Sequence, residues 1–146
     1  MTHDCYSTKR VTAWRSDLPA SDETGVEELG YAIKYQDGYQ SWCPLDVFER
    51  DYQPITAMSF GHAIHALKAG KRIARAGWNG KGMFLYLVAG SRFAVNRPPL
   101  LGIYEAGTEI DYRPHIDIRD AEGKCAPWNA SQPDMLADDW LILGEV

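Results

Sequence analysis

Cysteine, surplus positive charge and long apolar runs are all scarce in this sequence of 146 residues. Its three cysteines, Cys5, Cys43 and Cys125, are odd in number, far apart and without CxxC spacing. The pattern therefore indicates neither a disulfide framework nor a zinc site, and we expect reduced thiols. No apolar run approaches the length that crosses a bilayer, so we expect no membrane partner.

The formal net charge of −5 argues against binding of long nucleic acid, which normally needs a basic face. It does not argue against a small anion that is held in a local basic pocket. The segment Met1–Asp4 has no basic region followed by an apolar one, so nothing indicates a secretion signal. We therefore expect a cytoplasmic protein.

What is present is the composition of a soluble globular protein, with 45% hydrophobic and 24% charged residues. A chain of this length fits one domain, with or without a small appendage. It can bury about two thirds of the surface that its unfolded form exposes. A hydrophobic core can therefore form without disulfides.

Residues 1–54 predict a small β-rich N-terminal appendage. Two short strands, a tight hairpin turn and a short helical stretch are expected at Val11–Trp14, Tyr31–Tyr35, Asp37-Gly38 and Leu45–Tyr52. The polar and acidic stretch Asp17–Gly30 is typical of a mobile loop. Because so small a sheet is marginally stable alone, we expect this β-hairpin leader to dock on the rest of the chain.

Residues 55–146 predict the main domain, which begins with its main helix. Ser59 is a good N-cap, apolar residues follow at helical spacing, and Gly70 supplies the stop. A strand over Lys71–Ala76, a glycine-rich turn and a strand over Met83–Val88 then predict a hairpin. The second of these strands is apolar enough to be buried on both faces.

Beyond this hairpin, loop signals dominate Ala89–Gly107. Within it the run from Pro98 to Tyr104 is apolar and must be covered, either by this chain or at a subunit interface. A second hairpin that reaches Trp128, a helical turn and a closing strand are expected at Ile110–Trp128, Met135–Asp139 and Trp140–Leu143. The predicted class is α+β, a small antiparallel sheet of hairpins with one main helix, preceded by the hairpin leader.

The stretch Arg75–Gly82 is the strongest candidate for a binding site. Its three glycines let a ligand approach the backbone, Trp78 offers a stacking face, and Asn79 both donates and accepts hydrogen bonds. Arg75 and Lys81 add two cations. Such a cluster suits a planar, anionic molecule such as a nucleotide. The alternative is a structural hairpin turn with a core tryptophan and solvated charges.

Two histidine patterns suggest other chemistry. His62 and His65 lie three apart on the predicted helix and could share a metal, but no third ligand or HExxH motif accompanies them, so we expect no metal. His115 and Asp117 share one strand face and could serve as base and orienting acid of a nucleotide phosphodiesterase or glycohydrolase. Since no paired nucleophile is recognisable, we expect neither an enzyme nor a cofactor.

Several short motifs follow one another between Ala57 and Val146. They are Ser59-Phe60-Gly61, Lys71-Arg72-Ile73-Ala74-Arg75, Gly77 to Gly82, Arg97-Pro98-Pro99, Tyr112-Arg113-Pro114-His115, and Pro127-Trp128 with Asp134 to Trp140. In this order they resemble the second Thoeris anti-defence family of phage proteins. The leader lies outside the resemblance, although its Asp-Gly-Tyr-Gln-Ser-Trp pattern is similar to leaders of such phage proteins.

The resemblance implies a protein that binds cyclic ADP-ribose-type signals of bacterial Thoeris immunity and sequesters them without cleavage in the infected host cell. Some members also hold cyclic di- or trinucleotides at other sites, and members form homotetramers with ligand sites between subunits. Carried over by position, the ligand contacts are Trp78, Asn79, Trp128, Ser131, Gln132 and Asp134. Arg75 is added on chemical grounds, because a pyrophosphate favours a nearby guanidinium.

A third function stays open, that of a phage structural or host-interaction protein. Its contact surface would be the apolar run from Pro98 to Tyr104 together with the acidic leader.

Overall fold

The computed structural model describes residues 8–17, 28–78 and 81–144. The chain divides into two compact units, Met1–Pro54 and Ile55–Val146, which we call the first and the second unit. Both consist of antiparallel strands and short helices, so the predicted α+β class is confirmed.

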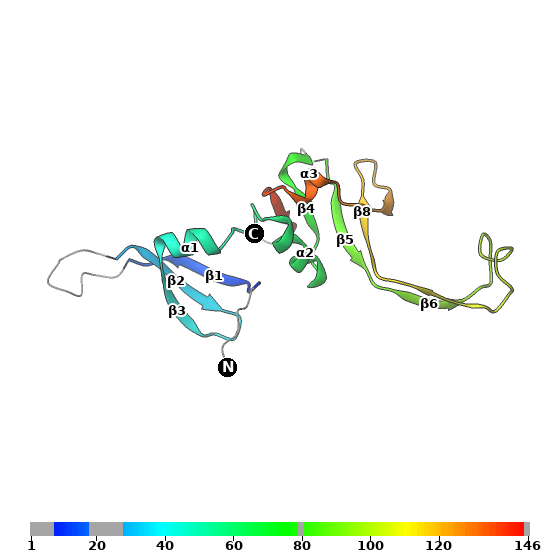
Figure 1. Ribbon diagram of the computed structural model, residues 1–146, viewed down its shortest axis with the longest axis horizontal. Coiled ribbons are helices and arrows are strands. Elements are labelled where there is room, and N and C mark those ends of the chain that lie inside the picture. Colours follow the sequence, from blue (N-terminus) through cyan, green and yellow to red (C-terminus); the bar gives the residue numbers. More distant parts are fainter. Residues whose placement is uncertain (1–7, 18–27, 79–80, 145–146) are drawn as a thin grey trace. The chain divides into compact units, whose positions relative to one another are not determined.

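The first unit is a three-stranded antiparallel sheet followed by a helix (Figure 1). In chain order its elements are β1 (Val11–Arg15), β2 (Gly30–Tyr35), β3 (Gln40–Pro44) and α1 (Leu45–Asp51). The predicted Asp-Gly turn joins β2 to β3: Gly38 has a positive φ of 89°, and its N–H donates to the Tyr35 carbonyl at 3.0 Å. Most of the predicted mobile loop lies outside the described residues.

Aromatic rings hold α1 against its sheet. Phe48 stacks on Tyr31 of β2 with 4.1 Å between ring centroids, and on Tyr52 with 4.7 Å. The backbone of β2 also approaches the Trp42 ring so closely that a Cβ at Gly30 would lie 2.3 Å from it. Residue 30 must therefore be glycine for these two strands to pack as they do.

The second unit has a five-stranded antiparallel sheet of order β10-β4-β5-β8-β9. Its strands and helices are α2 (Phe60–Lys68), β4 (Ile73–Arg75), the 3-10 helix η1 (Ala76–Trp78), β5 (Phe84–Val88), β6 (Ser91–Ala94), β7 (Glu109–Tyr112), β8 (His115–Arg119), β9 (Cys125–Pro127), α3 (Gln132–Met135) and β10 (Trp140–Ile142). The buried cluster joins one face of α2 to one face of this sheet, at Met58, Ala63, Ala66, Leu67, Ile73, Leu85, Trp140 and Ile142.

The predicted main helix is confirmed as α2. It ends as expected before Gly70, whose φ is 81°. Ser59 occupies the N-cap position but makes no side-chain capping bond, and its hydroxyl instead lies 3.0 Å from Nδ1 of His62. A serine hydroxyl can take this local alternative because a ring nitrogen three residues on lies on the same helix face.

Two expectations about the hairpin after α2 need correction. β4 pairs with β5 as predicted, but it is only three residues long, because the chain turns into η1 at Ala76. The expectation that β5 is buried on both faces is wrong. Leu85 is fully buried, whereas Leu87, on the same face, is 39% exposed because the cluster around α2 does not extend to it.

The prediction of an irregular loop over Ala89–Gly107 is also wrong in part. β6 lies within it and pairs with β7, and the two form a ribbon that continues β5 and β8 away from the five-stranded sheet (Figure 1). Short strands of this kind carry a weak local signal, since their pairing partner lies elsewhere in the chain. The apolar run of this segment is exposed, Ile103 to 68%.

In the described part of the chain, every helix is too short or too polar to cross a membrane.

Candidate functional site

The glycine-rich turn begins with η1, and Asp139 holds this short helix at two points. The Ala76 N–H donates to the Asp139 carbonyl at 3.0 Å, and the Gly77 N–H donates to its Oδ2 at 2.8 Å. A Cβ on Gly77 would lie 3.0 Å from that same Oδ2. The glycine therefore lets the carboxylate reach the backbone, and Trp78 follows directly. Asn79 lies outside the described residues.

A cavity of about 340 Å³ opens beside this turn. The residues that line it are Ala74, Arg75, Ala76, Trp78, Lys81, Gly82, Met83, Leu141 and Leu143. The cavity thus combines aliphatic side chains from the sheet with one indole and two cations from the turn. Such a lining suits a ligand that has a flat ring and an anionic group.

Four aromatic side chains gather on the buried side of the sheet. Trp140 is fully buried at the centre. Trp78 meets it edge-on at 5.6 Å between ring centroids, Trp128 does so at 6.1 Å, and Phe60 lies at 5.5 Å. The half-buried Trp78 is therefore both a packing partner of the core and a lining residue of the cavity. The sequence offered two interpretations of Trp78, a stacking surface for a ligand and a core residue, and its position is compatible with both.

Arg75 makes a bridge between two carboxylates. Its Nε donates to Asp139 Oδ1 at 2.7 Å and its Nη1 donates to Asp134 Oδ1 at 2.8 Å. The guanidinium carbon lies 5.9 Å from the centroid of the Trp140 ring. Hydrogen bonds to Asp139 and then to Asp134 raise the pKa of Arg75, and the bond from Arg75 lowers the pKa of Asp139. The charge of the guanidinium is thus matched by two carboxylates of its own chain, each of which accepts one of its N–H groups.

Three of the predicted contacts lie at the start of α3. Ser131 and Asp134 form a capping box, in which the Asp134 N–H donates to the Ser131 hydroxyl at 3.2 Å and Ser131 Oγ donates to Asp134 Oδ2 at 2.6 Å. Burial alone would raise the pKa of Asp134, but hydrogen bonds from Ser131 and Arg75 outweigh it and leave that pKa below its ordinary value. Ser131 and Gln132 remain exposed to solvent.

The predicted helical turn over Met135–Asp139 is wrong in position, since α3 spans Gln132–Met135. The reason is the capping box, which fixes the N-cap at Ser131 and places Pro133 in the first turn, where a missing N–H costs nothing. The pattern Ser131-x-x-Asp134 was readable in the sequence as a helix start.

The structure brings part of the predicted site together. Arg75 and Trp78 line the same cavity, and Arg75 links them to Asp134 and so to α3. Trp128, Ser131 and Gln132 do not line that cavity. Sequence reasoning missed Asp139, because a carboxylate 62 residues from Gly77 gives no local signal of the contact. It also missed the aliphatic wall made by Leu141 and Leu143.

The histidines show little of the alternative chemistry. Nε2 of His115 lies 3.5 Å from Asp117 Oδ1, while Asp117 Oδ2 accepts a hydrogen bond from the Tyr86 hydroxyl at 3.4 Å. The pKa of Tyr86 is raised to about 12, first by its hydrogen bond with Cys125, so this phenol remains protonated and is no base near neutral pH. Among the described residues, no three histidine, cysteine or acidic side chains are placed to hold a metal ion together.

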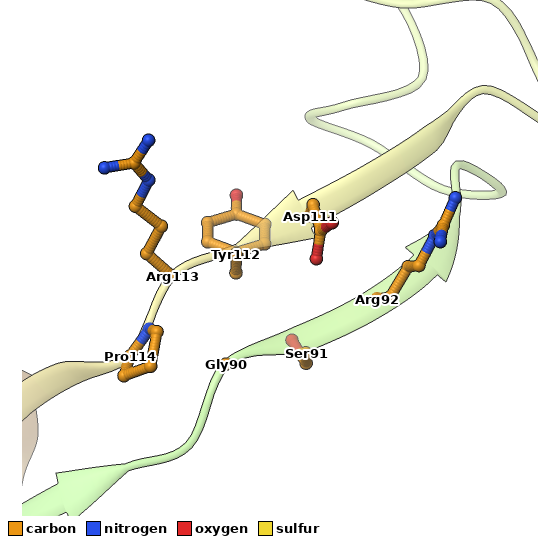
Figure 2. Close-up of a pocket in the computed structure, with 7 residues that line it drawn as sticks. All are labelled: Gly90, Ser91, Arg92, Asp111, Tyr112, Arg113 and Pro114. Atoms are coloured by element: carbon orange, nitrogen blue, oxygen red, sulfur yellow. The ribbon is translucent and has the colours of Figure 1, made fainter.

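A second hollow, of about 650 Å³, lies at the base of the ribbon. The backbone at Gly90 passes close to the backbone at Tyr112 there. A Cβ at Gly90 would lie 2.5 Å from the Tyr112 carbonyl, so residue 90 must be glycine for the two segments to approach this closely. Figure 2 shows Arg92 and Arg113 at opposite ends of the lining group, with Tyr112 between them. Since the two cations diverge, the hollow offers no convergent set of ligand contacts.

Comparison with known proteins gives a concordant result. Residues 58–143 match the family model described as Thoeris anti-defense 2-like domain, or Tad2-like. The chain is also 41% identical over 88 residues to the protein named Thoeris anti-defense 2 of Bacillus phage SP01, an alignment that covers 60% of this chain and 97% of the phage protein. The match contains the turn, its cavity and α3. Through the second unit, the chain belongs to the Thoeris anti-defense 2-like family.

Proposed function

We propose that the chain is a phage anti-defence protein that binds cyclic ADP-ribose-type immune signals and sequesters them without cleavage. It thereby blocks Thoeris-type immunity in the cytoplasm of the infected bacterial cell. The observation that carries this proposal is the family match: the family model covers residues 58–143, within the second unit, and 97% of a protein named for Thoeris anti-defence aligns with this chain. Residues 55–146 are accordingly the binding domain, and residues 1–54 are a small appendage.

The chemistry of the turn supports the proposal. The ligand contacts we propose are Trp78, Asn79, Trp128, Ser131, Gln132 and Asp134, and Arg75 belongs to the same site through its bond to Asp134. Stacking on an aromatic side chain contributes about 1 to 3 kcal/mol per base, and a hydrogen bond to a charged group about 1.5 to 3 kcal/mol. Two stacked rings and a few donors thus suffice for affinity in the nanomolar range, about −12 kcal/mol, and sequestration requires no catalytic group.

We further propose a homotetramer with its ligand sites between subunits. The exposed apolar side chains of the ribbon loop, Leu101, Ile103 and Tyr104, support it, because such patches usually mark contacts. Light scattering is expected to give the mass of a tetramer. A monodisperse monomer at micromolar concentration would contradict the assembly.

One experiment tests the binding function. The purified protein is incubated with a cyclic ADP-ribose isomer, passed through a desalting column and heated, and the released ligand is analysed by chromatography. Recovery of intact ligand is expected. Chemically altered ligand would indicate an enzyme, for which His115 and Asp117 would be the first residues to replace. The absence of retained ligand would favour an interaction protein instead.

A further inference from the structure

We propose, on the basis of the binding function above, that Lys81 rather than Arg75 supplies the positive charge for the ligand's phosphates. Arg75 is instead a positioning residue, which locks the Trp78 turn to the start of α3 through Asp139 and Asp134.

The charge around Arg75 already excludes it as a free anion site. Its side chain is 20% exposed and lies against two carboxylates, one of them 15% exposed, so the three groups together carry a net charge of −1. A phosphate brought to this guanidinium would meet two ionised carboxylates, whose pKa values are both lowered. Like charges at such distances repel, and the repulsion is stronger where solvent is partly excluded.

The same contacts fix the position of Trp78. Asp139 accepts the N–H of Gly77 with one carboxylate oxygen and the Nε of Arg75 with the other. The carboxylate cannot shift without breaking one of these bonds. The backbone carbonyl of Asp139 also accepts the N–H of Ala76. The residue before Trp78 is therefore tied to the sheet, which sets the direction of the indole at the cavity wall.

The other end of the bridge reaches α3. Asp134 binds Nη1 of Arg75 with one carboxylate oxygen and the Ser131 hydroxyl with the other, while its backbone carbonyl accepts Nε1–H of Trp140 at 3.0 Å. One guanidinium thus holds both regions in which ligand contacts are proposed, the turn and the start of α3. A lysine cannot replace it, because a single ammonium lacks the planar fork that reaches two carboxylates.

Lys81 has the properties that Arg75 lacks. It lines the cavity together with Trp78, and its side chain is exposed. Within the described part of the chain, no carboxylate forms an ion pair with it. Among the described residues, its ammonium is therefore open to a phosphate beside the indole, whereas Arg75, the other cation that lines the cavity, is paired with two carboxylates.

Calorimetric titration of the full chain with a cyclic ADP-ribose isomer, at about 50 and about 300 mM salt, tests the assignment. We expect Lys81→Gln to raise Kd about tenfold or more and to reduce its dependence on salt. The matched control is Lys68→Gln, which removes an exposed lysine near the end of α2 and should leave Kd unchanged. A Kd of Lys81→Gln equal to that of this control would overturn the role of Lys81.

Asp139→Asn separates positioning from direct contact by the sign of its effect. The substitution removes a negative charge near the ligand, so a directly binding Arg75 would bind the anion as tightly or more tightly. If Arg75 positions the turn, Asp139→Asn and Arg75→Lys both raise Kd about threefold or more. An unchanged or lower Kd for Asp139→Asn would overturn the positioning role. If this variant does not fold, Asp139→Glu, which keeps the charge but moves the carboxylate away from Gly77 and Arg75, gives a second test: a raised Kd supports the positioning role and an unchanged Kd overturns it.

Amide hydrogen exchange at Gly77 gives a reading without ligand. Exchange should become faster in Asp139→Asn and stay unchanged in Lys81→Gln, because the asparagine amide has a single acceptor oxygen for the two N–H groups, of Gly77 and Arg75, that the carboxylate binds. If the wild-type chain retains no probe, the proposed function falls and the Lys81 contact with it. A normal affinity of the wild type with unaltered variants would overturn only the assignment made here.

Discussion

The two units of the chain are stabilised in different ways. Among the described residues, Ile33 is the one fully buried hydrophobic side chain of the first unit, which otherwise relies on stacked aromatic rings. In the described part of the second unit ten hydrophobic residues are buried, most of them clustered around Trp140. The family match falls on the unit with the larger core.

The two units also differ in net charge. Residues 1–54 contain five basic and ten acidic side chains, whereas residues 55–146 contain ten of each. The net charge of −5 therefore belongs entirely to the first unit, and the unit with the candidate site is neutral. The net charge of the whole chain therefore says little about what the second unit binds, because the excess of acidic groups lies in the first unit.

Among substitutions that test this difference between the two units, we expect the largest effect from Trp140→Ala. Trp140 is fully buried, three aromatic side chains contact its ring, and its Nε1–H binds the Asp134 carbonyl. We expect the free energy of unfolding of the second unit to fall by about 3 to 5 kcal/mol. Ligand binding should weaken as well, because the site is part of this unit. Urea denaturation followed by circular dichroism measures the first, and calorimetry the second. Unchanged stability would mean that the core of this unit lies elsewhere.

Gly30→Ala should disturb the first unit alone. The added methyl would lie 2.3 Å from the Trp42 ring and 2.5 Å from the Cys43 carbonyl, so strand or ring must shift at a cost of about 1 to 3 kcal/mol. We expect altered near-ultraviolet circular dichroism with unchanged Kd for the ligand. Gly61→Ala is the control for an added methyl, since a Cβ there would lie no closer than 3.9 Å to the Ser59 hydroxyl and the residue has no positive φ. Loss of binding in Gly30→Ala would contradict the assignment of the site to residues 55–146.

Much of this fold could be predicted from the sequence because its signals are local. The Asp-Gly turn before Tyr39, the apolar periodicity of α2 and the stop at Gly70 each depend on a few neighbouring residues. β6 was not predicted, because the exposed strand Ser91–Ala94 owes its form to pairing with β7. Local patterns report turns and caps, whereas pairing across a ribbon depends on residues far along the chain.

The candidate site, too, could be predicted only where its signals are local. Trp78 and Arg75 could be singled out by residue type and by their place beside glycines, and both do line one cavity. The role of Arg75 could not be predicted, because its partners Asp134 and Asp139 follow some sixty residues later. Residue chemistry identifies a cation, but only the fold shows whether that cation is already neutralised.

A smaller effect is expected from Trp78→Ala. If the indole stacks on the ligand, the substitution weakens binding by about 1 to 3 kcal/mol, or about five- to two-hundredfold. Because Trp78 is only half-buried, the loss in stability should be well below that of Trp140→Ala. Calorimetry and thermal denaturation separate the two, and Trp78→Phe, which keeps a stacking ring, should bind better than Trp78→Ala. A large loss of stability with unaltered Kd would make Trp78 a core residue only.

The smallest effect concerns pH. The pKa values of Asp134 and Asp139 are lowered in the folded chain, so both carboxylates bind protons less readily there than in the unfolded chain. Their contribution to stability is therefore fully present above about pH 4, the range of an unperturbed aspartate, and is lost as pH falls through their lowered values. Asp139→Asn lacks its share of this contribution, so its Tm should fall less than that of the wild type between about pH 5 and about pH 3. The difference is expected to be a few degrees at most, because the Asp139 side chain is 33% exposed and solvent screens its ion pair. Glu122→Gln is the matched control: it breaks the exposed pair with Lys124 and should follow the wild type. Parallel Tm curves for Asp139→Asn and the wild type would show that the bridge of Arg75 contributes nothing measurable to the stability of the second unit.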